Sequence, residues 1–227
     1  MIRLPPHTTQ NLVLRKPSAG VAIGGALAGQ SHVAMRVGAE ILAEGGNAID
    51  AAIATSIALA AVEPWNSGLG GIGFLLYRPA DTGKTVAIDF GPQAPAALDP
   101  SAFKLTGRTG GDLFGWPEIE GDRNAHGPLS FAIPGQVDGM GLAHAHFGTM
   151  DWAMLLERAA RLADRGLPVD YWTTLKTAAE APLLARYPSS AEIFMPGGFP
   201  PVPETGAATK FLPLRALALT IRRLQLK

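Results

Sequence analysis

The sequence contains no cysteine among its 227 residues, which excludes disulfide bonds, thiolate zinc sites and cysteine nucleophiles within this chain. It also carries no excess of charge, because 19 basic side chains balance 19 acidic ones. A neutral chain has no general electrostatic attraction for nucleic acid or for an anionic membrane surface. We therefore expect neither nucleic acid nor a membrane as a partner.

Long hydrophobic runs are missing as well. The longest apolar stretch, residues 51–62, contains two hydroxyl side chains and is shorter than the ~20 residues that a membrane-spanning helix needs. A basic pair near the N-terminus precedes residues 20–29, but this Gly- and Ala-rich stretch is too far from Met1 and too weakly hydrophobic for a secretory signal peptide. We expect a cytoplasmic protein, and the sequence leaves a periplasmic location open.

What is present is a hydrophobic content of 47%, which is typical of a globular domain. Apolar residues at helical spacing predict one helix between Ser31 and Gly45 and a second over residues 48–62. Ser31 and Asn47 suit the N-cap positions of these helices, and Gly45 suits the left-handed residue after the first. The second helix is apolar almost all the way round, so we expect it to be buried on several sides.

Further along, two apolar segments, residues 74–78 and 85–90, are separated by a turn and predict a β-hairpin. Neither segment alternates clearly between apolar and polar residues, so we expect both faces of the hairpin to be covered. Residues 129–133 predict a third strand, and residues 106–127 predict a polar loop. Further helices are expected at about 136–146, 152–165, 170–187 and 214–224. This pattern predicts an α+β fold in which helices cover both faces of a sheet.

Residues 68–73, G-L-G-G-I-G, match the G-x-G-x-x-G pattern of dinucleotide-binding proteins. That kind of site requires a strand before the glycines and a helix after them. Here the predicted helix comes first and the predicted strand follows. We therefore interpret the segment as a structural turn, in which glycine allows the backbone to approach a neighbouring element closely.

No catalytic or metal-binding constellation is visible from the residues alone. His144 and His146 are two apart on a predicted helix and point to different faces, so we do not expect them to share an ion. The G-x-S-x-G pentapeptide of serine hydrolases is absent, and we interpret Ser67 and Ser130 as structural. Spacing alone cannot assemble an acid/base pair from the carboxylates at element ends, Glu63, Asp89 and Asp138.

Several specific segments follow one another along the chain. The first is A-E-I-L-A-E-G-G-N-A-I-D-A-A at residues 39–52. The others are V-E-P at 62–64, S-G-L-G-G at 67–71, I-D-F at 88–90, I-P-G-Q-V-D-G at 133–139 and F-G-T-M-D-W at 147–152. In these segments the sequence resembles the large subunit of the γ-glutamyltransferase family, whose members are also called glutathione hydrolases. The resemblance covers nearly the whole chain, so we interpret residues 1–227 as one portion of that subunit.

The resemblance implies the αββα sandwich of N-terminal-nucleophile hydrolases, incomplete in this chain. Family members are made as a precursor that cleaves itself, and the new N-terminal threonine of the small subunit serves as nucleophile and base. This threonine attacks a γ-glutamyl amide such as glutathione and passes the acyl group to water or an amino acid. The resemblance thus implies a small-subunit partner, a small-molecule γ-glutamyl or acyl amide as substrate, and no metal or organic cofactor.

The nucleophilic threonine of the family opens a T-T-H-x-S motif, which this sequence does not contain. Thr8 and Thr9 follow a histidine instead of preceding one, and Thr173 and Thr174 lead into Leu175. We therefore expect no catalytic residue in this chain, which we interpret as ending before the nucleophile. An incomplete domain of this kind predicts exposed strand edges and apolar surfaces.

The family's arginine that holds the glutamyl α-carboxylate lies in the pattern D-F-R-x-x-A-P, and residues 89–95 here read D-F-G-P-Q-A-P. Gly91 thus occupies the substrate-binding position of that arginine. The loss of a bidentate, charge-assisted contact predicts weak binding of a γ-glutamyl substrate, unless Arg108 or Arg123 takes its place. Two alternatives stay open: a cephalosporin-acylase-like amidase with altered acyl specificity, and a non-catalytic truncated remnant.

Overall fold

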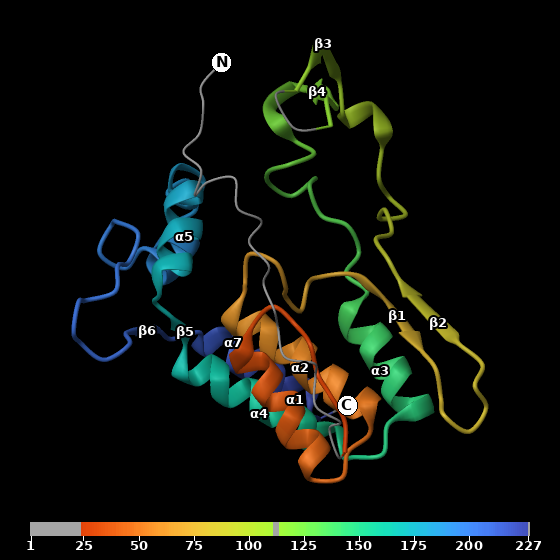
Figure 1. Ribbon diagram of the computed structural model, residues 1–227. Helices are drawn as coiled ribbons and strands as arrows, with labels where there is room; N and C mark the ends of the chain where they lie inside the picture. Colours follow the sequence, from red (N-terminus) through yellow and green to blue (C-terminus); the bar gives the residue numbers. More distant parts are fainter. Residues whose placement is uncertain (1–23, 111–113, 227) are drawn as a thin grey trace, which may run out of the picture.

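The computed structural model describes residues 24–110 and 114–226, which have a mixed α+β architecture (Figure 1). The α-helices are α1 (His32–Ala43), α2 (Ala48–Val62), α3 (Gln136–Phe147), α4 (Trp152–Arg165), α5 (Tyr171–Leu184), α6 (Pro188–Phe194) and α7 (Arg215–Leu224). The strands are β1 (Gly73–Tyr77), β2 (Val86–Phe90), β3 (Leu105–Thr109), β4 (Pro117–Ile119), β5 (Leu167–Pro168) and β6 (Phe211–Leu212). Two short 3-10 helices, η2 (Pro100–Ala102) and η3 (Glu120–Asp122), lie between β2 and α3.

Helix α2 lies at the centre of the core. Helices α1 and α4 pack against it, and α7 packs against α4 (Figure 1). One hydrophobic cluster joins these helices through completely buried side chains, Ile41, Ile53, Ile57, Leu155 and Ile221. Each such side chain contributes about 1.5–3 kcal/mol when it leaves water. The prediction that the second helix is buried on several sides is confirmed.

The helix boundaries follow the predicted caps. Ser31 Oγ accepts a hydrogen bond from the Ala34 N–H at 3.5 Å, and Gly45 has the left-handed φ of 95° just after α1. Asn47 Oδ1 accepts from the amides of the first turn of α2. A further cap, not assigned above from the sequence, is Asp151, which accepts from the Met154 N–H at 2.9 Å at the start of α4. These local signals position the helices correctly because a cap requires only neighbouring residues.

The predicted hairpin is present, with Gly73 opposite Phe90 and Tyr77 opposite Val86 in an antiparallel pair. Its two faces differ, since Phe90 is buried against α3 while Phe74 and Leu76 are 71% and 76% exposed. The expectation that both faces are covered is therefore wrong for the described residues. The hairpin has an exposed apolar face and belongs to a sheet of only two strands. The predicted exposure of strand edges and apolar surface is therefore confirmed.

Other parts of the sheet structure differ from expectation. Residues 129–133 form no strand. They contribute only an isolated β-bridge, in which the Ile133 N–H donates to the Gln93 carbonyl at 2.8 Å. Prolines bracket this segment, and the Ser130 hydroxyl turns back to the Gly127 carbonyl, which limits regular pairing. The predicted polar loop instead contains the β3–β4 pair, which Figure 1 shows standing away from the helices. Among the described residues no helix combines the length and hydrophobicity needed to cross a membrane.

Candidate functional site

The end of β2 is held in a socket of glycines around Phe90. A Cβ added at Gly73 would lie 2.7 Å from Phe90 Cε2, and one added at Gly135 would lie 2.7 Å from the Phe90 carbonyl oxygen. A Cβ at Gly139, in the first turns of α3, would also overlap the Phe90 ring. Three segments that are far apart in sequence therefore converge on one aromatic ring. Their glycines are required for close packing, and the socket positions the residue that follows, Gly91.

The glycine turn before β1 is tied to the start of α3 by Gln136. The Gln136 N–H donates to the Gly71 carbonyl at 3.0 Å, and its side-chain Nε2 donates to Ser56 Oγ of α2 at 3.2 Å. Gln136 is only 6% exposed, so these bonds form in a low-dielectric setting where an unmade bond is costly. The turn leads into strand β1 with no helix at its glycines, as the structural interpretation expects.

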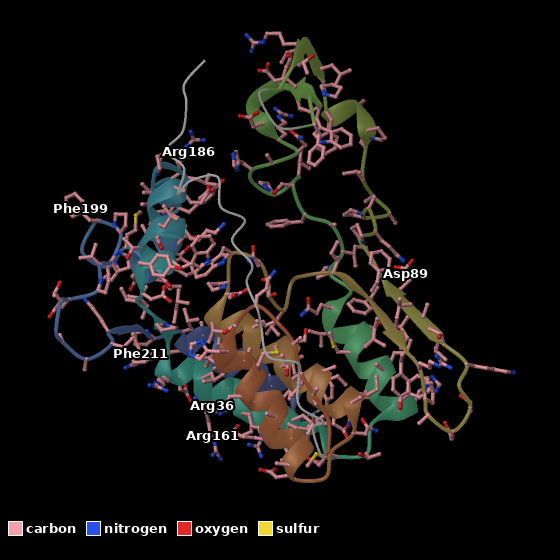
Figure 2. The ribbon with its side chains drawn as sticks, viewed as in Figure 1. Arg36, Asp89, Arg161, Arg186, Phe199 and Phe211 are labelled. Carbon is pink, nitrogen blue, oxygen red and sulfur yellow. The ribbon has the colours of Figure 1, made fainter. Side chains whose placement is uncertain are left out.

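Gly91 follows β2, and its N–H donates to Asp89 Oδ1 at 2.8 Å. A Cβ at position 91 would meet Asp89 Oδ1 at 3.0 Å and Phe74 Cζ at 3.2 Å. Both of these are side-chain atoms at an exposed edge, so a larger residue would need only small shifts. Figure 2 shows Asp89 at this end of β2. The position therefore presents a carboxylate, Asp89, and lacks the guanidinium that the resemblance implies.

The two arginines that sequence offered as substitutes lie in the β3–β4 region. Arg108 forms a two-pronged contact with Glu118, with Nε and Nη2 at 2.8 and 2.6 Å from its carboxylate oxygens. This hydrogen bonding raises the pKa of Arg108 above its ordinary value. Arg123 directly follows η3. Neither arginine is brought to Gly91 by any contact of the described residues.

The most specific motif of the sequence, E-G-G-N-A-I-D-A-A, forms a buried joint instead of a reactive site. Asp50 is completely buried and accepts hydrogen bonds from the Asn47 N–H at 2.9 Å, Thr149 Oγ1 at 2.6 Å and the Thr149 N–H at 3.0 Å. Asn47 Nδ2 donates to the Phe147 carbonyl at 2.6 Å. The start of α2 is thereby locked to the turn between α3 and α4.

The charge state of Asp50 reflects two opposing effects. Burial alone would raise its pKa, but the hydrogen bonds from Thr149, Asn47 and Met150 outweigh that effect and lower the pKa below its ordinary value. The carboxylate therefore stays ionised at neutral pH and accepts from donors on both sides of the joint. No sequence signal identified Thr149 as its partner, because the two residues are 99 positions apart.

The remaining candidates have structural roles. His144 Nε2 lies 2.8 Å from the Met150 carbonyl oxygen, and its ring packs near Trp152. Thr173 Oγ1 donates to the Pro168 carbonyl at 2.8 Å, while Thr8 and Thr9 lie outside the described residues. Across residues 24–110 and 114–226, no three histidine or acidic side chains cluster closely enough to hold a metal ion. No hydrogen bond among these residues joins the carboxylates at element ends, Glu63, Asp89 and Asp138.

Comparison with known proteins identifies a family. A family model described as Gamma-glutamyltranspeptidase matches residues 34–227. The chain is 36% identical over 187 residues to the acylase ACY 1 proenzyme of Pseudomonas sp. (strain SE83), covering 82% of this chain and 32% of that protein. It is 32% identical over 176 residues to the glutathione hydrolase proenzyme of Bacillus subtilis (strain 168), covering 78% and 28%. The chain thus spans about a quarter to a third of the length of these curated relatives.

Solved structures also include members of this family that resemble the chain. The crystal structure of Helicobacter pylori gamma-glutamyltranspeptidase superposes with a TM-score of 0.78 at 27% identity, covering 92% of this chain and 56% of that one. The cephalosporin acylase from Bacillus halodurans has a TM-score of 0.68 at 22% identity and covers 94% of this chain and 39% of its own. At that identity the second likeness concerns the fold alone.

Proposed function

Because this chain belongs to the γ-glutamyltranspeptidase family, we propose that it is part of the large subunit of an amide hydrolase or acyltransferase. The reaction is cleavage of a γ-glutamyl-type amide such as glutathione through an acyl-enzyme on a threonine that this chain does not contain. The match over residues 34–227 is the observation that carries this proposal. The chain supplies scaffold and one wall of the substrate site, at the end of β2.

The partner in this proposal is a small subunit that bears the N-terminal threonine. The exposed face of the β1–β2 hairpin, with Phe74 and Leu76 uncovered, supports such a partner, since an unpaired sheet edge with an apolar face favours the addition of strands. In the complete protein these additional strands would make the αββα sandwich. Neither strand has another pairing partner among the described residues.

A second candidate concerns the acyl group, and the region of Gly91 favours it. A γ-glutamyl substrate carries an α-carboxylate, which requires donors or a cation where it binds. Position 91 provides no side chain, and the neighbouring charged group is the carboxylate of Asp89, which repels another anion. Each lost charge-assisted hydrogen bond is worth about 1.5–3 kcal/mol. We therefore favour acyl groups without the α-carboxylate, as in an acylase.

The test uses an enzyme assembled from this chain and a small subunit with an N-terminal threonine. Hydrolysis of γ-glutamyl 4-nitroanilide is compared with that of 4-aminobutyryl 4-nitroanilide, which differs only by the missing carboxylate. We expect the unmutated enzyme to prefer the aminobutyryl compound. Gly91→Arg should raise kcat/KM for the γ-glutamyl compound about 30-fold, corresponding to ~2 kcal/mol.

Gly197→Arg is the matched control, because a Cβ there meets nothing within 4 Å and it adds the same charge elsewhere. If the unmutated enzyme prefers the γ-glutamyl compound, the acylase candidate is wrong and the γ-glutamyl proposal stands. If the two subunits associate but neither anilide is cleaved, the amidase proposal itself fails. Absence of association with any small subunit would favour the non-catalytic remnant.

A further inference from the structure

A cleft rich in arginine lies between α1, α4 and β6, on the opposite side of the helical layer from β2 (Figure 1). Its volume is about 620 Å³, within the range of small-molecule sites. Four arginines line it, Arg36 of α1 and Arg158, Arg161 and Arg165 of α4. In Figure 2, Arg36, Arg161 and Phe211 lie on this side of the molecule, while Arg186 lies at the far end of α5.

The local structure explains why these side chains gather. Arg158, Arg161 and Arg165 recur at intervals of three and four residues, so they share one face of α4. Arg36 comes from α1, which packs beside α4. The chain as a whole is neutral, so this concentration of guanidinium groups is a local feature.

Two of the arginines are already held in place. Arg158 reaches Glu40 with Nη1 at 2.8 Å and Glu44 with Nη2 at 2.6 Å. Its side chain is only 23% exposed. The guanidinium carbon of Arg165 lies 4.3 Å from the centre of the Phe211 ring, a cation–π contact that orders the group without neutralising it.

The charge of the cleft is incompletely balanced. Its lining holds four arginines against two acids, Glu40 and Asp170. Glu40 pairs with Arg158, and Arg161 pairs with Glu157 outside the lining. Asp170 keeps its negative charge, but it caps α5 by accepting from the Thr173 N–H at 2.8 Å and forms no ion pair with the arginines of the cleft. Arg36 and Arg165 have no carboxylate partner among residues 24–110 and 114–226. Two guanidinium groups therefore remain available in a cleft that also has apolar walls, Val33, Val37, Leu162 and Phe211.

We propose that this cleft binds a small molecule bearing oxyanion groups, carboxylate or phosphate, through Arg36 and Arg165. Guanidinium groups recognise both kinds of oxyanion through paired hydrogen bonds. The apolar part of the ligand contacts Leu162 and Phe211. This binding site is separate from the end of β2 and does not depend on the amidase proposal, since its readout is binding and not turnover.

The experiment titrates this chain by isothermal calorimetry at low ionic strength with three probes: glutarate, inorganic pyrophosphate and the neutral glutaramide. We expect saturable one-site binding of at least one anion and none of glutaramide. Binding of glutarate alone assigns a carboxylate ligand, and binding of pyrophosphate alone assigns a phosphate. In the double variant Arg36→Gln, Arg165→Gln the affinity should fall at least tenfold.

Arg186→Gln is the control for a lost guanidinium group, because it removes one positive charge, where the double variant removes two, from an arginine remote from the cleft. This variant should bind as the unmutated chain does. Neither Arg36 nor Arg165 forms an ion pair with a described residue, and the lost contact between Arg165 and Phe211 is worth only about 0.5–1 kcal/mol. Thermal unfolding of the double variant should therefore change little, which separates lost binding from lost folding. Equal weakening by Arg186→Gln, binding of glutaramide, or no saturable binding of either anion at millimolar concentration would overturn the proposal.

Discussion

Replacing Asp50 with asparagine should destabilise the chain strongly, because Asp50 lies at the joint between α2 and the α3–α4 turn. The substitution keeps the shape of the side chain but leaves one oxygen to accept where the carboxylate has two. In one orientation the new amide NH₂ would face the Asn47 N–H, which donates to Oδ2 at 2.9 Å. In the other it would face the Thr149 N–H, which donates to Oδ1 at 3.0 Å, so one donor loses its acceptor either way. Breaking a completely buried, charge-assisted network of this kind costs about 3–5 kcal/mol.

The pH dependence has a definite sign. Because the folded-state pKa of Asp50 is lowered from 3.8, its ionisation stabilises the folded state above about pH 4, and this contribution is lost as the pH falls further through the folded-state value. The difference in unfolding free energy between the unmutated chain and Asp50→Asn should therefore be full at pH 7. It should shrink once the pH drops well below 4.

Urea unfolding followed by circular dichroism measures both quantities. Asp151→Asn is the control, since Asp151 caps α4 through one exposed contact and asparagine caps about as well as aspartate. That change should cost less than about 0.5 kcal/mol. A cost below about 1 kcal/mol for Asp50→Asn, or a difference that does not shrink in acid, would refute the role assigned to this network.

Two further predictions concern packing. Gly139→Ala should lower the free energy of unfolding by about 1–3 kcal/mol, because the new methyl group overlaps the Phe90 ring and overpacking carries costs of this size. The control is Gly141→Ala, whose Cβ meets nothing within 4 Å; it should be neutral or stabilising in the same urea titration. The double variant Phe74→Ser, Leu76→Ser should bind less of a hydrophobic dye such as ANS. Its stability should fall only slightly, since both side chains are more than two-thirds exposed. An unchanged dye signal would show that the accessible apolar surface lies elsewhere.

Much of the helical structure could be predicted from the sequence. Helices α1, α2, α4 and α7 have an apolar period or a cap that depends only on neighbouring residues. Ser31, Asn47 and Asp151 occupy the N-cap positions that their side chains suit. The β1–β2 hairpin could be predicted for the same reason, because its strands are close in sequence and joined by a turn.

The short strands could not be predicted in this way. Strand β5 has only two residues, and its partner β6 lies more than forty positions further along the chain, so no local pattern marks either one. The exposure of one face of the hairpin could not be predicted from the sequence either, because apolar residues such as Phe74 indicate burial whether or not the covering element is present. Residues 129–133 had the composition of a strand, yet the surrounding prolines prevented regular pairing.

The candidate site, like the fold, could be predicted from the sequence only in part. By itself the sequence determined the family, through E-G-G-N-A-I-D-A-A and the segments that follow it, and it determined that Gly91 occurs where the resemblance implies an arginine. Only the tertiary structure decided that Asp50 locks two helices, that glycines enclose Phe90, and that Arg36 faces a cleft with the arginines of α4. The physical reason is that caps, turns and periodicity act between neighbours, whereas hydrogen bonds and close packing between residues about a hundred positions apart exist only once the helices have packed together.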